Sequence, residues 1–393
     1  MSDHVVIVSA ARTPMGAMTG SLSSLAAHEL GSVAIKAALE RAGVNPDQVD
    51  EVIMGNVLQA GQGQAPARQA AIGAGLPNNA PCTTIHKVCG SGMKAAMLGH
   101  DLLKVGSANV VVAGGQESMS NAPYLLLKAR TGYRYGHDKV YDHMALDGLE
   151  DAYEGIAMGV LAERCAEKYA FTREEQDAFA LESLRRARAA TEDGSFKAEI
   201  APVTIKGRKG ETVVDTDEAP TRAMPDKIPS LRPAFKKDGT ITAANASSIS
   251  DGAAAMVLMR ESTAKELGAQ PLARIVAHTQ HAHEPEWFTT APVGAVQKLL
   301  DKTGWKIEDV DLFEINEAFA VVTMAAMKDL NIPHEKVNVY GGATALGHPI
   351  GASGARIVTT LIHALKQKGG KRGIATLCIG GGEAVAMAVE LVD

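Results

Sequence analysis

Aromatic residues are scarce in this chain of 393 residues and make up only 4% of it. The core must therefore consist mainly of Ala, Val, Ile, Leu and Met, which suits helices that pack closely on a sheet. Charged residues contribute 21% and hydrophobic residues 46%. This composition excludes a disordered or fibrous chain, and the length predicts two or three domains that share cores.

The chain also has no excess of basic charge, since its formal net charge is -6. A negative field repels polyanions, so nucleic acid is not expected as a partner. The sequence contains neither an apolar run of about 18 residues nor a recognisable targeting signal, so no membrane span is expected. These absences predict a soluble cytoplasmic protein.

Cysteine is rare as well. The four cysteines are Cys82, Cys89, Cys165 and Cys378. Without a CxxC pair or framework spacing, they predict neither disulfides nor a zinc site. His278, His281 and His283 have spacing that resembles metal ligands, but no acidic or cysteine cluster accompanies them in sequence. We therefore expect no metal, and interpret the three histidines as a polar loop near an opening.

Short apolar runs alternate with longer helix-like segments. The runs at residues 5–8, 110–113, 255–259 and 374–377 are typical of buried parallel strands. The segments at residues 26–42, 92–103, 172–191, 318–330 and 354–368 are expected to be helices. This alternation predicts an α/β fold.

The two ends of the chain resemble each other in three motifs about 260 residues apart. The pairs are residues 49–52 with 310–313, 89–95 with 351–356, and 112–115 with 378–381. They predict a duplicated α/β unit, although Gly-rich turns after strands can also look alike by chance. We expect an N-terminal half at 1–120, completed by about 250–270, an inserted loop domain at 121–249 and a C-terminal half at 271–393.

Cys89 precedes the Gly-Ser-Gly that opens a helix-like segment. A helix N-terminus lowers a thiol pKa, so we expect Cys89 to be a thiolate nucleophile. The alternative is an inert buried cysteine in a tight turn. Cys378 ends an apolar run before a Gly triplet that includes Gly380, whose amide could bind an oxyanion. Alone, Cys378 is equally compatible with an ordinary strand end.

His348 lies in a Gly-rich loop between Gly347 and Pro349, where its near-neutral pKa suits proton transfer. The loop contains no GK[ST] sequence, so a phosphate-binding P-loop is not expected. Asn316 follows an apolar run and would emerge at a strand end, where side chains can reach a site. Its alternative role is an N-cap of the helix that follows.

Together these motifs resemble the signature set of the thiolase family. The motifs are Cys89-Gly-Ser-Gly, Asn316-Glu-Ala-Phe, Gly347-His-Pro-Ile-Gly-Ala-Ser-Gly and Cys378-Ile-Gly-Gly-Gly. The likeness extends over the whole chain, from residues 7–14 at the start to 231–235 and 245–247 in the middle. It implies two thiolase-type halves in a five-layered α-β-α-β-α core, a loop domain that covers coenzyme A, and a homotetramer.

The resemblance also implies residue roles. Cys89 would accept the acyl group, His348 would activate it and donate to an oxyanion, and Cys378 would be the acid and base. Asn316 would hold an oxyanion water, and the amides of Cys89 and Gly380 would form a second oxyanion hole. The residues implied for binding substrate and coenzyme A are Met158, Arg222, Phe235, Ala243, Ser247, Ala318 and Phe319. Three further basic residues, Lys206, Arg208 and Lys209, are candidates for binding the phosphates of coenzyme A.

The implied activity is the reversible condensation of two acetyl-CoA molecules to acetoacetyl-CoA in fatty acid metabolism. Coenzyme A is then substrate and product, and no cofactor is needed. Acetoacetyl-CoA thiolases generally carry histidine at the position of Ala157 and a Met-Gly-x-Gly-Pro stretch in the segment that contains Phe288. These two departures leave a broad-range 3-oxoacyl-CoA thiolase as an alternative. A decarboxylating ketosynthase remains less favoured, because such enzymes lack a second catalytic cysteine like Cys378. Intact Cys89, His348, Asn316 and Cys378 disfavour a non-catalytic lipid-binding protein. A cysteine hydrolase is disfavoured because the glycine motifs indicate a thioester pocket and no triad spacing stands out.

Overall fold

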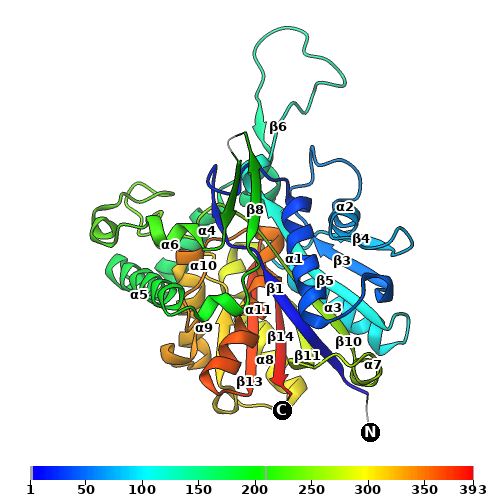
Figure 1. Ribbon diagram of the computed structural model, residues 1–393. Helices are drawn as coiled ribbons and strands as arrows, with labels where there is room; N and C mark the ends of the chain where they lie inside the picture. Colours follow the sequence, from blue (N-terminus) through cyan, green and yellow to red (C-terminus); the bar gives the residue numbers. More distant parts are fainter. Residues whose placement is uncertain (1–2, 209, 393) are drawn as a thin grey trace.

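The computed structural model describes residues 3–208 and 210–392. Within these residues, ten strands form one mixed sheet in the order β12-β13-β14-β11-β1-β10-β5-β3-β4, and β2 pairs with β10 (Figure 1). The strands are β1 (Val5–Arg12), β2 (Gly16–Ala17), β3 (Glu51–Gly55), β4 (Cys82–Ile85), β5 (Val110–Ser118), β10 (Ser250–Arg260), β11 (Ala273–Ala282), β12 (Leu312–Ile315), β13 (Arg372–Ile379) and β14 (Glu383–Leu391). The helices that contact this sheet most are α1 (Ala27–Ala42), α2 (Pro66–Gly73), α3 (Ser91–Lys104), α8 (Ala291–Thr303) and α11 (Ile350–Lys368).

The strand pairing confirms the duplication. In the first half, β3 runs parallel to β5, and β5, β10 and β1 follow in antiparallel pairs. In the second half, β12 runs parallel to β13, and β13, β14 and β11 follow in antiparallel pairs. The halves meet where β1 pairs with β11. Since β1, β10 and β14 make antiparallel pairs, the prediction of parallel strands at residues 5–8 and 255–259 was wrong.

Two helices, one from each half, lie in the middle of the molecule. Helices α3 and α11 pack on each other and on the sheet, while α1 and α2 cover the first half and α8 covers the second. The two central helices approach closely: a Cβ on Gly354 would lie 2.4 Å from the Met93 amide nitrogen, and one on Gly92 2.7 Å from that of Ala355. This arrangement gives the five-layered core that was predicted.

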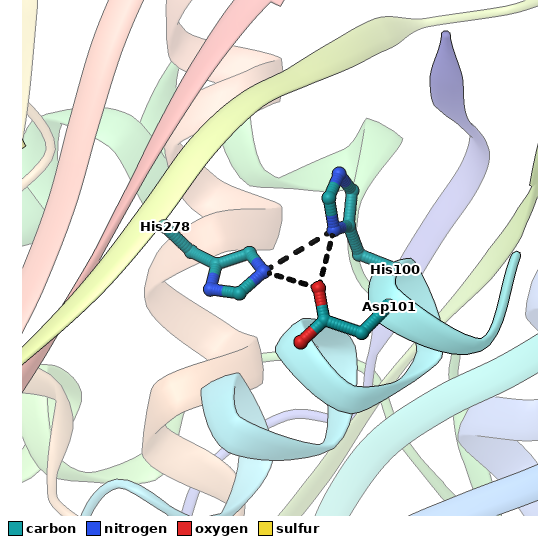
Figure 2. Close-up of side chains that lie close together, drawn as sticks. All are labelled: His100, Asp101 and His278. Carbon is teal, nitrogen blue, oxygen red and sulfur yellow. Dashed lines mark hydrogen bonds and ion pairs between the residues drawn. The ribbon is translucent and has the colours of Figure 1, made fainter. Parts of the chain in front are cut away.

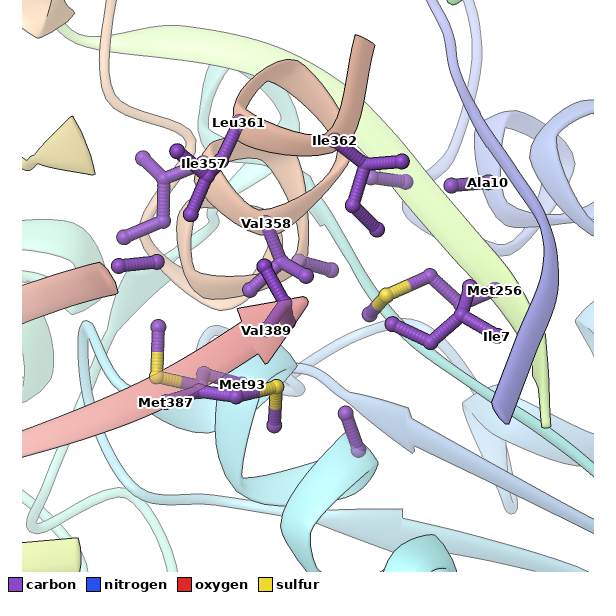
Figure 3. Close-up of a cluster of buried hydrophobic side chains, with 14 of the residues drawn as sticks. Ile7, Ala10, Met93, Met256, Ile357, Val358, Leu361, Ile362, Met387 and Val389 are labelled. Atoms are coloured by element: carbon purple, nitrogen blue, oxygen red, sulfur yellow. The ribbon is translucent and has the colours of Figure 1, made fainter. Parts of the chain in front are cut away.

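The central layer is almost wholly buried. Helix α11 buries 15 of its 19 residues, as expected of a helix with protein on every side. Figure 3 shows its side chains Ile357 and Val358 in one cluster with Met93, Met256 and Met387. Burial of one such side chain stabilises the fold by about 1.5–3 kcal/mol. The helix begins at Ile350, four residues before the predicted start, so the loop that holds His348 is short.

Residues 121–249 contribute no strand to the ten-stranded sheet of the described chain. They form α4 (Met158–Tyr169), α5 (Arg173–Glu192), α6 (Glu218–Arg222) and the hairpins β6 (Tyr124–Leu125) with β7 (Tyr141–Asp142) and β8 (Val203–Gly207) with β9 (Gly210–Val214). The fully buried guanidinium of Arg12 in β1 binds Glu199 at 2.5 Å and Asp217 at 2.7 Å, which ties this segment to the first half. Figure 1 shows the segment that leads away from β6 projecting from the molecule.

None of the helices in residues 3–208 and 210–392 has the length and apolar character needed to cross a membrane.

Candidate active site

A cavity of about 490 Å³ lies between the two halves and the inserted segment. Ten of the twelve predicted site residues line it: Cys89, Met158, Phe235, Ala243, Ser247, Ala318, Phe319, His348, Cys378 and Gly380. Asn316 and Arg222 are not part of its wall. The fold therefore brings together both cysteines and the histidine, which come from three separate motifs.

Cys89 lies in a tight turn between β4 and α3. The preceding residue, Val88, has φ of 45°, a left-handed conformation that costs energy for a β-branched side chain. The Ser91 hydroxyl fixes this turn, because it accepts the Lys87 amide at 2.8 Å and donates to the Val88 carbonyl at 2.7 Å. The strained turn therefore holds the sulfur at the start of α3.

Despite this position, burial raises the pKa of Cys89 to about 11. Hydrogen bonds from the backbone amides of Gly380 and Cys89 itself lower it, but they do not outweigh the lost hydration. The prediction of a lowered thiol pKa was therefore wrong. Cys89 rests as a neutral thiol and needs a base when it attacks, while the same two amides can stabilise an oxyanion beside the sulfur.

His348 is placed to be that base. Its Nδ1 atom lies 2.5 Å from the Ser353 hydroxyl oxygen, and this hydroxyl donates to the Pro349 carbonyl at 3.0 Å. Since the hydroxyl proton is used, Nδ1 must carry the ring proton and donate to Ser353. Burial and then the charge of Arg356 lower the pKa of His348 to about 3. The imidazole is thus neutral, and its buried Nε2, which has no partner in the described chain, can accept a proton.

Cys378 lies near the end of β13 and is 1% exposed. Burial and then the nearby Cys89 raise its pKa well above the ordinary value. The turn after it needs glycine, since Gly381 and Gly382 have φ of 93° and 82°. This turn presents the Gly380 amide to the Cys89 sulfur. Cys378 therefore lies near a strand end and also lines the cavity, and its role as acid and base stays a prediction.

Asn316 follows β12 and is 1% exposed. Its Nδ2 atom is buried without a hydrogen-bond partner in the described chain, and its Oδ1 lies 3.5 Å from the Arg356 guanidinium. Buried amide groups are normally satisfied by protein or by ordered water. Helix α9 (Ala320–Leu330) has Phe319 as its N-cap, so the capping role considered for Asn316 is wrong. Its role as holder of a water stays a prediction.

The apolar wall of the cavity comes mostly from the inserted segment and the loop before β10. Gly159 must be glycine, because a Cβ there would lie 2.3 Å from the Phe235 ring. Ala157 and Phe288, the two departures from the family pattern, both line the cavity. Arg222 lies on α6, 63% exposed, and forms an ion pair with Glu218, so its contact with coenzyme A stays a prediction. Lys209 lies outside the described residues.

One buried carboxylate beside the site, that of Glu117, was not among the residues predicted from the sequence. It accepts hydrogen bonds from the Asn56 side chain at 2.8 Å and from three backbone amides, those of Val57, Leu58 and Gly351. Burial raises the pKa of Glu117 to about 7. These bonds tie the loop after β3 to the start of α11. Carboxylates are so rarely buried that no residue pattern could have indicated this.

The histidine loop expected at residues 278–283 is instead mostly strand. His278 and His281 lie within β11, and three residues of separation send their side chains to opposite faces. His281 stacks edge-on with His283 at 5.2 Å between ring centroids, whereas His278 contacts His100 and Asp101. The three predicted candidates therefore do not form one site.

A half-buried thiol at Cys89, a buried thiol at Cys378, a neutral imidazole and paired backbone amides surround one apolar cavity. Together they define a cysteine-dependent acyl-transfer enzyme built from two α/β halves. Comparison with family models agrees: "Thiolase, N-terminal domain" matches residues 5–262 and "Thiolase, C-terminal domain" matches residues 269–391. The chain belongs to the thiolase family.

Known relatives match almost end to end. The chain is 54% identical to acetyl-CoA acetyltransferase 2 of Arabidopsis thaliana, over 99% of this chain and 97% of that protein. It is 52% identical to an acetyl-CoA acetyltransferase of Pseudomonas aeruginosa, over 98% of each. Two crystal structures are 45% identical: the acetyl-CoA acetyltransferase of Bacillus anthracis, with a TM-score of 0.97 over 99% of both chains, and a thiolase of Ascaris suum in complex with coenzyme A, with a TM-score of 0.94 over 99% of this chain and 100% of that one.

Proposed function

We propose that this enzyme is an acetyl-CoA acetyltransferase, which condenses two acetyl-CoA molecules reversibly to acetoacetyl-CoA and free coenzyme A. The observation that carries the proposal is the convergence of Cys89, His348 and Cys378 on one apolar cavity. The names of the full-length relatives support the choice of substrate. The Ascaris suum complex supports coenzyme A as the ligand of this fold.

In the first half-reaction, the Cys89 sulfur attacks the thioester carbonyl of acetyl-CoA while Nε2 of His348 takes the thiol proton. The amides of Cys89 and Gly380 stabilise the oxyanion of the tetrahedral intermediate. The carbon–sulfur bond to coenzyme A then breaks, and the departing thiolate takes the Cys378 proton. The enzyme is left with acetyl-Cys89, a protonated His348 and a Cys378 thiolate.

In the second half-reaction, the Cys378 thiolate removes a methyl proton from a second acetyl-CoA. Burial makes this thiolate an unusually strong base, because its pKa is raised well above the ordinary value, and a carbon acid requires such a base. The protonated His348 and a water held by Asn316 stabilise the enolate. The enolate carbon attacks acetyl-Cys89, acetoacetyl-CoA leaves, and His348 returns its proton to the Cys89 sulfur.

The acyl pocket supports a short chain. Phe288 lines the cavity and is 2% exposed, so its ring takes up volume that a longer acyl group would need. Its neighbour Trp287 is not in the wall, and the Lys168 ammonium lies over the Trp287 ring, 4.1 Å from the ring centroid. Turnover of acetoacetyl-CoA and of 3-oxooctanoyl-CoA with free coenzyme A, measured side by side, distinguishes this enzyme from a broad-range thiolase.

We also propose that the enzyme is a homotetramer, that it is located in the cytoplasm and that it acts in fatty acid metabolism. Several large apolar side chains stand exposed near the projecting segment: Tyr124, Leu126, Leu127, Tyr135 and Val140. Such exposure supports burial against another copy of the chain, which light scattering would test. The four cysteines are free thiols in the described chain, which supports a reducing compartment. Cell fractionation would test the cytoplasmic location. Loss of acetoacetyl-CoA formation in cells without the protein would test the role in fatty acid metabolism.

A further inference from the structure

Three metal-ligating side chains meet on the surface, away from the cavity. His100 and Asp101 lie on α3, and His278 lies on β11 in the other half of the molecule. Figure 2 shows one ring nitrogen of each histidine and one oxygen of Asp101 directed at a common point. None of the three side chains lines the cavity. His100 lies about 14 Å along the axis of α3 from the end of the helix that adjoins Cys89. The proposed catalytic mechanism does not use them.

The three atoms form a nearly equilateral triangle. Nε2 of His278 lies 3.2 Å from Nδ1 of His100 and 3.0 Å from Oδ1 of Asp101, and the latter two atoms are 3.0 Å apart. Bonds of about 2.1 Å place neighbouring ligand atoms about 3.0 Å apart around an octahedral ion and about 3.4 Å apart around a tetrahedral one. The edges of the triangle fall within this range.

Hydrogen bonding alone does not explain the triangle. If both ring nitrogens carry protons, both can donate to Asp101, but the two N–H groups then face each other. If only one ring nitrogen carries a proton, the lone pair of the other ring nitrogen faces the carboxylate oxygen of Asp101. Each arrangement of protons leaves one close contact repulsive. A cation above the centre of the triangle makes all three contacts favourable.

The local environment leaves the three side chains open to an ion. The side chains of His100 and His278 each keep 12% of their surface exposed, and that of Asp101 keeps 58%. Metal binding requires neutral imidazoles and an ionised carboxylate. The ammonium groups of Lys104 and Lys302 lie close enough to oppose a cation.

We propose that His100, Asp101 and His278 bind one divalent transition-metal ion, such as Zn²⁺, which clamps the first half of the fold to the second. Two imidazoles and one carboxylate are the ligand set of such ions, and water would fill the remaining positions. Mg²⁺, which prefers oxygen ligands, should not compete. Because the clamp joins α3 to β11, bound metal should stabilise the folded chain.

The test is a titration of the chelator-treated enzyme with Zn²⁺ in competition with a chromophoric chelator, after Cys89 has been blocked with iodoacetamide. We expect one ion per chain and a higher Tm with Zn²⁺ than without it. Loss of an outer partner of a metal ligand costs about 10- to 100-fold in affinity, so His278→Gln and Asp101→Asn should each cost at least about tenfold. Lys302→Gln should tighten binding, because it removes an opposing charge.

His281→Gln is the matched control, since it removes a histidine from the same strand but from the other face. It should bind Zn²⁺ as the unchanged enzyme does. Equal affinity in the His278→Gln and unchanged proteins, or no saturable binding in the unchanged protein, would overturn the proposal. Asp101→Asn alters an exposed carboxylate, so it provides a second measurement if His278→Gln does not fold, and retained acetoacetyl-CoA turnover verifies the fold of each variant.

Discussion

Nδ1 of His348 lies 2.5 Å from the hydroxyl oxygen of Ser353, one turn into the helix that His348 precedes. Because Ser353 donates its own proton to Pro349, it can only accept from the imidazole. The pair therefore fixes the tautomer whose Nε2 is free to take a proton from Cys89. Ser353, in the same Gly-rich motif, thus determines which ring nitrogen of His348 carries the proton.

Ser353→Ala should lower kcat about 10- to 100-fold with little change in KM. The imidazole would lose the acceptor that fixes its tautomer, at a cost of about 1–3 kcal/mol. Steady-state thiolysis of acetoacetyl-CoA checks this, and Ser353→Thr should restore most of the rate. Thr359→Val, which removes a buried hydroxyl from the same helix, should leave kcat unchanged. Equal rates in Ser353→Ala and the unchanged enzyme would contradict this role.

Incubation with acetyl-CoA, followed by an acid quench and peptide mass spectrometry, should place an acetyl group on Cys89. The reason is that the backbone amides of Gly380 and Cys89 both hydrogen-bond to this sulfur. Cys82→Ser, which removes a partly exposed cysteine, should not affect labelling, whereas Cys89→Ser should abolish it. A reproducible adduct on a different cysteine would refute the assignment.

Cys378→Ala should still become acetylated at Cys89 but should exchange the methyl protons of acetyl-CoA with deuterated water at least about a hundredfold more slowly. The variant lacks the base of the second half-reaction and keeps the nucleophile of the first. Nuclear magnetic resonance of the methyl group measures the exchange. Cys165→Ala, which removes another buried thiol near the site, is the control, and normal exchange in Cys378→Ala would identify a different base.

Alkylation of Cys89 by iodoacetamide should accelerate with pH. With a pKa of about 11, the thiolate fraction grows about tenfold per pH unit from pH 7 to pH 10. If the pKa of the thiol were lowered to the neutral range, the rate of alkylation would instead reach a plateau near pH 7 or 8. Stopped-time labelling quantified by mass spectrometry distinguishes the two cases, and a plateau below pH 9 would contradict the effect of burial.

The ratio kcat/KM should fall from four-carbon to eight-carbon 3-oxoacyl-CoA substrates. Overlap with the Phe288 ring is costly in a close-packed wall. Phe288→Ala should shift the preference toward the longer substrate, since each methylene that fits adds about 0.8 kcal/mol, or about fourfold. Trp287→Ala, which changes an aromatic residue outside the wall, is the control. A steady rise with chain length in the unchanged enzyme would favour a broad-range thiolase.

The sequence by itself determined the duplication and, through the motifs that resemble those of thiolases, that Cys89, His348 and Cys378 would line one cavity. Local reasons account for this: glycines around Cys89, His348 and Cys378 permit turns that few other sequences adopt, and apolar runs mark buried strands whatever their direction. Strand direction was not determined, because the apolar run of β10 is buried on both faces in an antiparallel pair just as it would be in a parallel one.

Only the tertiary structure decided the energetics of the site. The sequence placed Cys89 at a helix N-terminus and so indicated a low pKa, but loss of hydration depends on everything that packs around the sulfur, and it is the larger effect. Likewise, His100 and His278 are 178 residues apart, and they meet only because the tertiary fold brings a side chain of α3 into contact with one of β11. Spacing along the chain can predict ligands that share a turn or a helix, but not ligands that the packing of two halves brings together.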